Sequence, residues 1–327
     1  MQNKKIIIAG GTGFIGQEIC NFFGAQNQLV ILTRQLPNQQ SNAFGENNLN
    51  PEVIKNIRYV NWDGENMGAW ATEFEEAAMV INLAGKTVNC RYTEKNKAAI
   101  FESRIRSTKL IGQAILQATH PPELWINAAS ATIYPNASNE PRDEYFTNFA
   151  DDFSVQVCKQ WEKIFYDQPT TATRKIALRM AITIGTGGVM IPYFNLIKFG
   201  LGGRQGNGKQ QYSWVHVEDT CRIIDWLYEN KLLEGTFNCS SPNPVSNAAF
   251  MKTLRTATGC KFGLPAFTWM LKIGAKMIGT ETELILKSRW VLPTKILQTG
   301  FQFRYPFLKD ALKEIVSKTN PKKYRLF

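Results

Sequence analysis

Three glycines lie three residues apart near the start of the chain, at Gly10, Gly13 and Gly16. The apolar run KIIIA comes before them, and the helical pattern FIGQEICNFF begins among them. Glycines in this place permit a tight turn and let backbone amides approach a pyrophosphate. Three glycines at a turn can also serve helix packing alone, but the strand before and the helix after favour a dinucleotide site. The predicted cofactor-binding residues of this loop are Gly10, Thr12, Gly13, Phe14, Ile15 and Gly16.

Thr33 and Arg34 end the next apolar run, LVILT. A site that prefers NAD normally offers Asp or Glu at this point to the hydroxyls of the adenosine ribose, whereas a guanidinium suits a 2'-phosphate. Arg34 could also be a solvated charge at a strand end. We expect both residues to contact the cofactor, and we expect that cofactor to be NADP.

Residues that could bind a metal are scarce. The chain has two histidines, His120 and His216, and its six cysteines include no CxxC pair. We therefore predict no metal site. The cysteines are expected to be reduced thiols, which indicates a cytoplasmic protein. His216, isolated in the run WVHVED, is expected to have a structural role.

The formal net charge is +11, from 38 Lys and Arg against 27 Asp and Glu. Such a surface attracts anions, including phosphorylated cofactors and acidic substrates. The basic residues are spread along the chain instead of forming a stripe, which argues against nucleic acid as a partner. No stretch approaches the roughly 20 apolar residues that cross a bilayer, so no membrane is predicted. The expected partner is a small-molecule substrate, possibly anionic.

Short β-branched runs alternate with helical patterns from residue 5 onward. The strand candidates are KIIIA, LVILT, IRYV, MVINLA, LWINAA and RKIALRMAITI. This alternation predicts an α/β fold: a Rossmann-type, doubly wound parallel sheet with helices on both faces. The rhythm fails after about residue 186, where a smaller, mostly helical C-terminal lobe begins.

We expect the two lobes to be interleaved in sequence. The NADP-binding domain is predicted to comprise residues 1–185 and about 217–240, because a helix and the strand-like GTFNCS return to it. Asp219 is the expected cap of that helix. The substrate-side lobe is predicted to comprise residues 186–216 and 241–327.

Several motifs resemble the extended short-chain dehydrogenase/reductases. They are GGTGFIG at 10–16, NLAG at 82–85 and the run SATIY at 130–134. The stretches SRIRST, CKQWE, GLGGRQGNGKQQYSWVHVED and LKSRWVLPTKILQTGFQF resemble one atypical branch. Its members are NAD(P)-dependent epimerase/dehydratase-like proteins with a small C-terminal domain of unknown function.

The resemblance implies a six- or seven-stranded sheet, with NADP over the carboxyl ends of the strands and a substrate cleft under the second lobe. It also implies further cofactor contacts. Leu83, Ala84 and Gly85 would line the cofactor, Trp62 and Asp63 would meet the adenine, and Ile182 would lie at the nicotinamide end.

The family's usual catalytic pair is missing. Working enzymes of this fold use a Tyr-x-x-x-Lys pair on one helix, in which the tyrosine exchanges a proton beside hydride transfer. Alignment of DDFSVQVCKQWE places Ser154 and Cys158 at those positions, with Lys159 about 100° further round the helix. The chain's only Tyr-x-x-x-Lys, Tyr305 with Lys309, contains Pro306 and lies in the second lobe.

Ser130 and Tyr134 are the candidate catalytic residues. The family places a hydroxyl and a tyrosine after this strand, where they can hydrogen-bond a substrate carbonyl or alcohol. Ser130 could equally cap a turn, and Tyr134 could pack its loop. Tyr212 stands where sugar-nucleotide epimerases carry an arginine for the diphosphate, which argues against a nucleotide-sugar substrate.

Arg104 replaces an asparagine that ordinary extended members carry on this helix. A guanidinium in a partly enclosed cleft needs an anion, because an unpaired buried charge is costly. We predict Arg104 as a cofactor-binding residue, with the cofactor diphosphate or an acidic group beside the nicotinamide as its anion. Alternatively, Arg104 could turn outward to Glu102 or Glu94.

These residues favour an NADP-binding oxidoreductase or epimerase-like protein that acts on a small polar substrate. Loss of the proton-transfer pair keeps a second hypothesis open, a cofactor-binding sensor or scaffold with little or no turnover. A basic interaction protein built on the same fold is the third.

Overall fold

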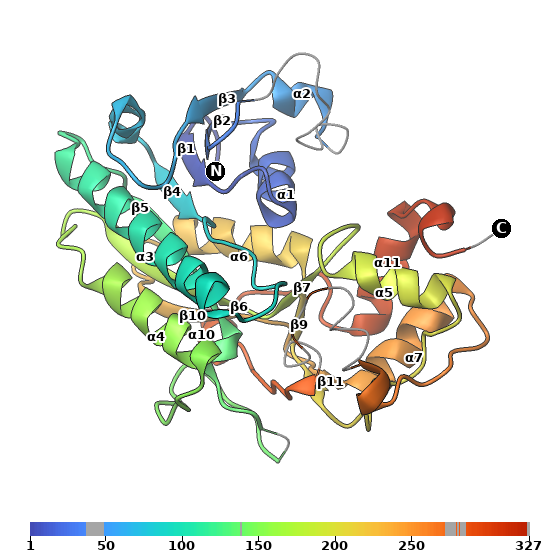
Figure 1. Cartoon of the computed structure of the whole chain (residues 1–327). Coiled ribbons are helices and arrows are strands. Elements are labelled where there is room, and N and C mark those ends of the chain that lie inside the picture. The colour runs from blue at the N-terminus through green and yellow to red at the C-terminus, as the bar shows by residue number, and fades with distance from the viewer. Residues whose placement is uncertain (37–48, 138, 272–278, 280, 282–285, 326–327) are drawn as a thin grey trace.

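The computed structural model describes residues 1–327 except 37–48, 138, 272–278, 280, 282–285 and 326–327. Within the described residues, seven strands form one parallel sheet in the order β10-β6-β5-β4-β1-β2-β3 (Figure 1). The strands are β1 (Lys5–Ala9), β2 (Gln28–Thr33), β3 (Ile57–Asn61), β4 (Met79–Asn82), β5 (Leu124–Ser130), β6 (Arg174–Met180) and β10 (Gly235–Cys239). The β-branched residues of β1, β2, β4, β5 and β6 are buried because helices cover both faces. The predicted Rossmann-type sheet is confirmed.

Two helix layers enclose the sheet. One face carries α1 (Phe14–Phe23) and α6 (Val217–Glu229), whose residues Ile19, Ile223 and Ile224 join one apolar cluster with the strands. The other carries α3 (Glu94–Gln117), α4 (Phe153–Tyr166) and the 3₁₀ helix η3 (Ala69–Phe74). Short elements complete the loops: α2 (Pro51–Ile54) and η4 (Ala131–Ile133).

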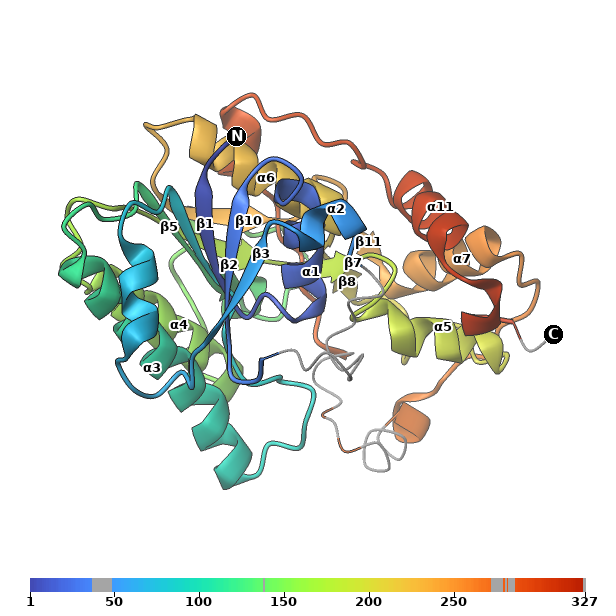
Figure 2. The ribbon, with the colours of Figure 1, turned by 90° about the horizontal axis from the view of Figure 1, so that it is seen from above.

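A second lobe stands beside the sheet, on the side away from α3 and α4 (Figures 1 and 2). Its helices α5 (Met190–Lys198), α7 (Asn247–Thr258) and α11 (Leu308–Lys318) share a separate apolar cluster. Two small strand pairs and a 3₁₀ helix accompany them: β7 (Ile182–Ile184) with β9 (Trp214–His216), β8 (Gln211–Tyr212) with β11 (Val245–Ser246), and η5 (Pro321–Lys323). Among the described residues, no helix combines the length and the apolar character needed to cross a membrane.

The run RKIALRMAITI, expected as one strand, divides into two. Arg174–Met180 belongs to the large sheet, whereas Ile182–Ile184 leaves it and pairs with Trp214–His216. The strand β10 then adds to the sheet beside β6, so the segment around 217–240 lies with the first lobe.

The helix α10 (Thr294–Gln298) lies against the first lobe, although the sequence assigned residues 241–327 to the second. Ile296 and Phe301 are buried in the cluster that α1, α6 and the strands form. Glu144 fixes this segment, because its carboxylate accepts hydrogen bonds from the backbone N–H groups of Asn238 and Lys295.

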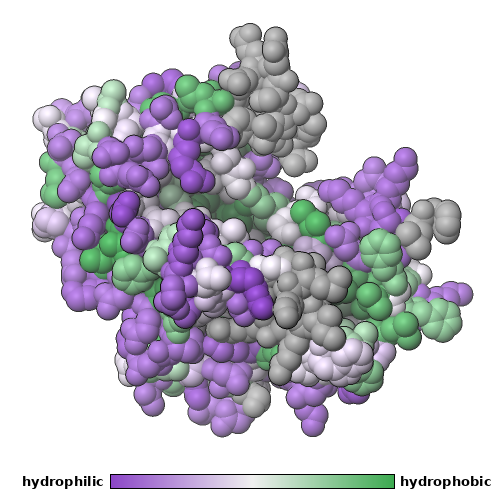
Figure 3. Space-filling view, in the orientation of Figure 1, coloured by the Kyte–Doolittle hydropathy of each residue, from purple (hydrophilic) through white to green (hydrophobic). Residues whose placement is uncertain are grey.

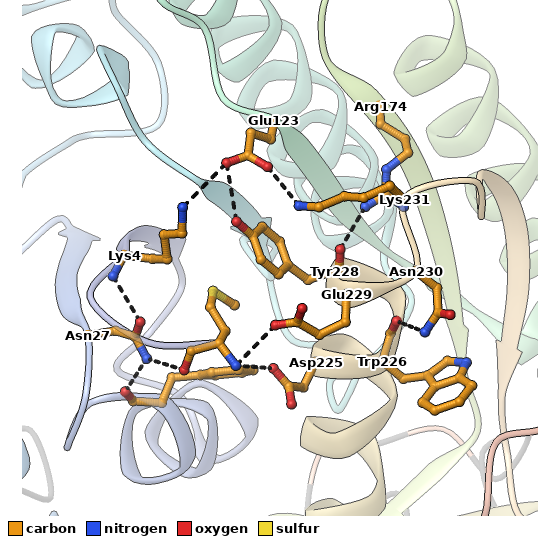
Figure 4. Close-up of polar contacts among 12 residues, drawn as sticks. Lys4, Asn27, Glu123, Arg174, Asp225, Trp226, Tyr228, Glu229, Asn230 and Lys231 are labelled. Carbon is orange, nitrogen blue, oxygen red and sulfur yellow. Dashed lines mark hydrogen bonds and ion pairs between the residues drawn. The ribbon is translucent and has the colours of Figure 1, made fainter.

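A polar network anchors α6 at the amino end of the sheet (Figure 4). Glu123, just before β5, accepts hydrogen bonds from the Tyr228 hydroxyl at 3.2 Å and from Lys231 at 2.7 Å. Lys4 lies 3.8 Å from the same carboxylate. Arg174 donates to the carbonyl oxygens of Leu227 and Tyr228 at the end of α6. These contacts tie the returning segment to β1, β5 and β6.

His216, and not Asp219, caps α6. The His216 Nδ1 accepts a hydrogen bond from the Glu218 N–H, so the structural role expected for this histidine is confirmed. Asp219 is fully buried, and its carboxylate accepts the backbone N–H groups of Arg304 and Tyr305. The expected cap was wrong because those amides of a distant loop occupy the carboxylate.

Candidate cofactor and substrate site

The phosphate loop joins β1 to α1 at the carboxyl edge of the sheet. Gly13 is the N-cap of α1 and no side chain caps the first turn, which leaves its amides available to an anion. Gly10 has a φ of 81°, and a Cβ there would lie 3.0 Å from the carbonyl carbon of Leu83. A Cβ on Gly16 would lie 2.5 Å from the Cα of Gly11. Glycine is therefore required at both ends of this turn.

The end of β2 offers a cation to the adenosine half of a dinucleotide. Arg34 is exposed and makes no ion pair with any described residue. Beside it, the Thr33 hydroxyl donates to the carbonyl oxygen of Gln35 at 3.0 Å. These two residues lie next to each other at the edge where the phosphate loop ends, as the sequence predicts.

Trp62 and Asp63 follow β3. The Trp62 N–H donates to the Thr33 carbonyl at 2.9 Å, and its buried ring packs against Trp70. Asp63 instead shapes its own loop, because its carboxylate accepts hydrogen bonds from Asn66 and from the Glu65 N–H. Those bonds lower the pKa of Asp63.

Leu83, Ala84 and Gly85 form the turn after β4, directly against the phosphate loop. The Leu83 N–H donates to the Ala9 carbonyl, and the Ala84 N–H donates to the Asn82 side-chain oxygen at 3.0 Å. Asn82 is fully buried and its amide also donates to Asn127 at 2.7 Å. This buried amide pair holds the turn after β4 in register with β5.

Ser130 ends β5 and caps η4. Its hydroxyl accepts the Thr132 N–H at 3.1 Å and donates to the Thr132 hydroxyl at 2.9 Å. Both side chains are half-buried. The capping alternative is therefore realised, yet it leaves a pair of hydroxyls at the carboxyl edge of the sheet. Thr132 was not singled out in the sequence, although it stands in the run SATIY.

Tyr134 lies in the core instead of facing the edge where substrate was expected. It is 1% exposed, its hydroxyl accepts a hydrogen bond from Arg179 at 2.9 Å, and it donates to Asn238 at 2.9 Å. Burial raises the pKa of Tyr134 to about 12. The physical reason is the buried cation: Arg179 needs acceptors, and the phenol oxygen supplies one.

The positions of the family's catalytic pair hold no acid or base. Cys158 is buried, and burial together with the nearby Glu162 carboxylate raises the pKa of its thiol to about 12. Ser154 is half-buried. Lys159 pairs with Asp151 at 3.2 Å, outside the helix interface. At neutral pH the Cys158 thiol therefore keeps its proton.

The Arg104 side chain lies inside the structure and does not pair with the surface carboxylates considered above, Glu102 and Glu94. Glu102 pairs with Arg106 and Glu94 pairs with Lys97. The Arg104 guanidinium stacks on Trp161 of α4, 5.1 Å from its ring centre, and touches the turn at Gly85. Within the described residues it has no acidic partner, and burial lowers its pKa.

Ile182 and Phe14 meet the segment that leads to the second lobe. Ile182 begins β7 and packs partly against the second-lobe cluster. The ring of Phe14 lies against Gly185, Gly187 and Gly188, where an added Cβ would come within 2.6 to 2.9 Å of it. The sequence analysis missed this contact, for which the glycine run IGTGGV was the available signal.

The hollow between the two lobes is visible in Figure 3. A cleft of about 410 Å³ lies where α1 and α6 of the first lobe meet α11 of the second, lined by Glu18, His216 and Glu314 among others. Tyr212 is buried, and its hydroxyl hydrogen-bonds Gln205. Among the described residues, no group of three His, Cys, Asp or Glu side chains could hold a metal ion.

Comparison with known proteins shows which family the chain belongs to. Residues 6–155 match the NAD dependent epimerase/dehydratase family, and residues 266–315 match a domain of unknown function (DUF1731). An epimerase family protein of Staphylococcus aureus is 31% identical over 319 residues, which is 96% of this chain and all of the relative. The chain belongs to this epimerase family.

Solved structures of the epimerase family share the fold. The human epimerase family protein SDR39U1, solved with NADPH, has a TM-score of 0.81 at 25% identity and covers 96% of this chain and 99% of its own. A UDP-glucuronic acid 4-epimerase from Bacillus cereus, solved with NAD, has a TM-score of 0.75 at 16% identity, with 96% and 98% covered. The second likeness shows the fold alone.

Proposed function

We propose that this member of the epimerase family binds NADP(H) and uses it to oxidise, reduce or epimerise a small polar substrate. One observation carries the proposal: an exposed Arg34, which forms no ion pair with the residues that the structure describes, stands at the end of β2, beside an uncapped phosphate loop. A guanidinium there can pair with a 2'-phosphate, whereas NAD offers only hydroxyls. That the human relative was solved with NADPH supports the same choice.

The cofactor residues have distinct roles in this proposal. The amides of Thr12 to Gly16 bind the diphosphate, Thr33 and Arg34 bind the adenosine phosphate, and Leu83 to Gly85 lie under the middle of the cofactor. Trp62 and Asp63 border the adenine end of the cofactor, and Asp63 does so through the loop that it shapes. Ile182 borders the nicotinamide end. Bound NADP would supply a hydride acceptor or donor.

The Ser130 and Thr132 hydroxyls are the proposed substrate contacts. They stand at the carboxyl end of β5, the edge at which ligands of open α/β sheets bind. A hydroxyl pair can orient a substrate carbonyl or alcohol through hydrogen bonds. Tyr134, whose hydroxyl is committed to Arg179 and Asn238, is not part of this proposed contact.

Cofactor titration tests the proposal. NADPH should bind the wild-type protein more tightly than NADH, and Arg34→Asp should reverse that order, because a carboxylate repels the 2'-phosphate and accepts bonds from ribose hydroxyls. Fluorescence of the reduced nicotinamide measures both affinities. Arg58→Asp, at an exposed arginine paired with Glu73, is the matched control and should leave the ratio unchanged. Equal affinities in the wild type would refute the choice of NADP.

A second candidate function is a cofactor-binding sensor or scaffold with little turnover. The specific observation that favours it is the chemistry at the catalytic-pair positions, where Cys158 has a pKa of about 12 and Ser154 replaces tyrosine. A panel of small carbonyl and alcohol substrates, followed by NADPH absorbance, separates the two. Tight NADPH binding without oxidation of NADPH on any substrate would favour the sensor.

We propose the cytoplasm as the place of action. All six cysteines are free, as expected of a protein in a reducing compartment. The proposed partner is a small molecule and not nucleic acid or a membrane. Core placement of Tyr212 at the position of the nucleotide-sugar arginine supports a substrate other than a nucleotide sugar.

A further inference from the structure

The guanidinium of Arg104 is held rigidly from one side. Its Nη1 donates to the carbonyl oxygens of Lys86 at 3.1 Å and Ile100 at 2.9 Å. Its flat face stacks on Trp161, and that ring is fixed in turn because the indole N–H donates to the Thr108 hydroxyl at 3.1 Å. Backbone and aromatic contacts thus orient the group before any ligand arrives.

The opposite edge of the guanidinium is unused. An arginine offers five N–H donors, and both on Nη1 are engaged. Neither Nε nor Nη2 of Arg104 donates to any residue that the structure describes. These two nitrogens form the fork that accepts both oxygens of a carboxylate or phosphate at once.

Among the described residues, no carboxylate pairs with this fork. Its electrostatic neighbours are the Cys158 thiol and the Tyr92 phenol. With a pKa of about 12 the thiol is neutral at pH 7, and tyrosine side chains are normally neutral there as well. Arg179, a buried arginine that also lies near Cys158, has Glu162 as its counterion.

The location of Arg104 favours substrate over cofactor. The turn at 83–85 meets the phosphate loop through Leu83 and Ala84, which lie against Gly10, and it meets Arg104 through Gly85. The turn therefore stands between the diphosphate site and the guanidinium. Arg104 also stacks on α4, the helix after β5, and so belongs to the half of the sheet that carries the nicotinamide in this fold.

We propose that Arg104 binds the anionic group of an acidic substrate, a carboxylate or a phosphate, through its Nε and Nη2 atoms. This inference rests on the proposed function, since it names the substrate class of the same site. A planar carboxylate matches the fork in two parallel hydrogen bonds, and a phosphate presents the same pair of oxygens.

Titration of malonate and of inorganic phosphate tests the proposal by calorimetry, with and without saturating NADPH. Arg104→Met should weaken binding of the preferred anion roughly tenfold or more, and Arg104→Lys should recover only part of it, because an ammonium cannot form the bidentate pair. Arg106→Met is the matched control on the same helix, at an exposed arginine paired with Glu102, and should bind as the wild type does. Comparison of malonate with phosphate identifies the type of anion.

NADPH affinity separates this proposal from the previous one. In Arg104→Met the affinity for NADPH should change by less than about twofold, which is small compared with a tenfold change in affinity. A large loss of NADPH binding with unchanged anion binding would place Arg104 on the cofactor and overturn the inference. So would a wild-type protein that binds neither anion. Failure of the wild type to bind NADPH, with Arg104-dependent anion binding intact, would refute the cofactor proposal alone.

Discussion

At the scale of single residues, the buried guanidinium of Arg179 determines the hydrogen bonds that Glu162 and Tyr134 make. Arg179 donates from Nε and Nη2 to the two oxygens of Glu162, each at 2.7 Å, and from Nη1 to the Tyr134 hydroxyl. The pKa of Arg179 is raised, because the Glu162 carboxylate outweighs the effect of burial. A phenol held between this cation and Asn238 stabilises the fold and is remote from proton exchange.

Replacing Tyr134 by phenylalanine should therefore reduce stability. The ring that stacks on Arg179 would remain, but Arg179 and Asn238 would each lose a partner inside the core. The expected loss in the free energy of unfolding is about 1–3 kcal/mol, the cost of leaving buried polar groups unsatisfied. Urea unfolding followed by circular dichroism measures it.

Tyr145→Phe is the control for that experiment. The Tyr145 ring is exposed and its hydroxyl donates to Gln298 at the surface, so its removal should leave stability nearly unchanged. Suppose that Tyr134→Phe leaves the free energy of unfolding unchanged but abolishes a turnover that the wild type shows. That result would support the catalytic role first considered for Tyr134.

Some of these residues could be predicted from local sequence and others could not. Glycine spacing and the arginine after LVILT are signals carried within a few residues, and the structure brings those residues to one edge of the sheet. The role of Tyr134 depends on Arg179, 45 positions away, and on Asn238, 104 positions away. No local pattern around SATIY contains either partner.

At the scale of elements, a hydrogen bond from the cap of α6 to a carboxylate of α11 joins the two lobes. The His216 Nε2 lies 3.0 Å from the Glu314 carboxylate, and Lys318 pairs with the same group. Although burial opposes ionisation, the hydrogen bonds from His216 and Lys318 lower the pKa of Glu314 to about 2. The charged carboxylate is thus part of what holds α11 against the cap of α6.

Acid should weaken this contact over a defined range. The folded pKa of Glu314 is about 2 against an ordinary value of 4.5, so its contribution is complete above pH 4.5 and disappears as pH falls toward 2. Glu314→Gln keeps a hydrogen-bonding oxygen but lacks the charge. It should unfold at lower urea concentration than the wild type at pH 7, and the gap should close between these two pH values.

Glu94→Gln provides the comparison for the pH series, since Glu94 is exposed and only pairs with Lys97. Its difference from the wild type should be small at every pH. A Glu314→Gln gap that stays constant down to pH 2 would mean that shape, and not charge, holds α11 in place.

The helices and strands were predicted from the sequence more accurately than the helix caps and the strand ends. Apolar, β-branched runs mark the strands because burial on both faces demands such residues. The cap of α6 was misassigned because aspartate is the more common cap, whereas here Asp219 serves the backbone of Arg304 and Tyr305. The split between β6 and β7 was missed because a continuous apolar run carries no mark where a strand changes sheet.

At the scale of the whole molecule, the first lobe is assembled from three separate stretches of chain. The strands up to β6 come first, α6 and β10 return after β9, and the segment around α10 returns again to bury Ile296 and Phe301. The sequence indicated the second stretch through GTFNCS. The third stretch was missed because α10 is short and lies among residues assigned to the second lobe. Its sequence does not indicate which of the two cores it packs into.

Ile296→Ala should consequently destabilise the first lobe and not a peripheral tail. The expected cost is about 2–5 kcal/mol, which is usual for removing a fully buried isoleucine. Leu297→Ala, at an exposed neighbour, should cost far less. Circular dichroism and release of bound NADPH should report one common unfolding transition at lower urea. Loss of the α10 contribution in a separate early transition, with NADPH retained, would contradict this shared core.

The three-part assembly also has a consequence for biosynthesis. When the ribosome has released only the residues up to β6, that strand is an open sheet edge and the face later covered by α6 exposes isoleucines and leucines to water. Both features promote association between unfinished chains. The β6 edge is paired only after β10 has emerged, and the apolar face is complete only after Phe301. The nascent first lobe therefore stays prone to association until translation has passed Phe301, and its yield in a cell should depend on the chaperones that shield nascent chains.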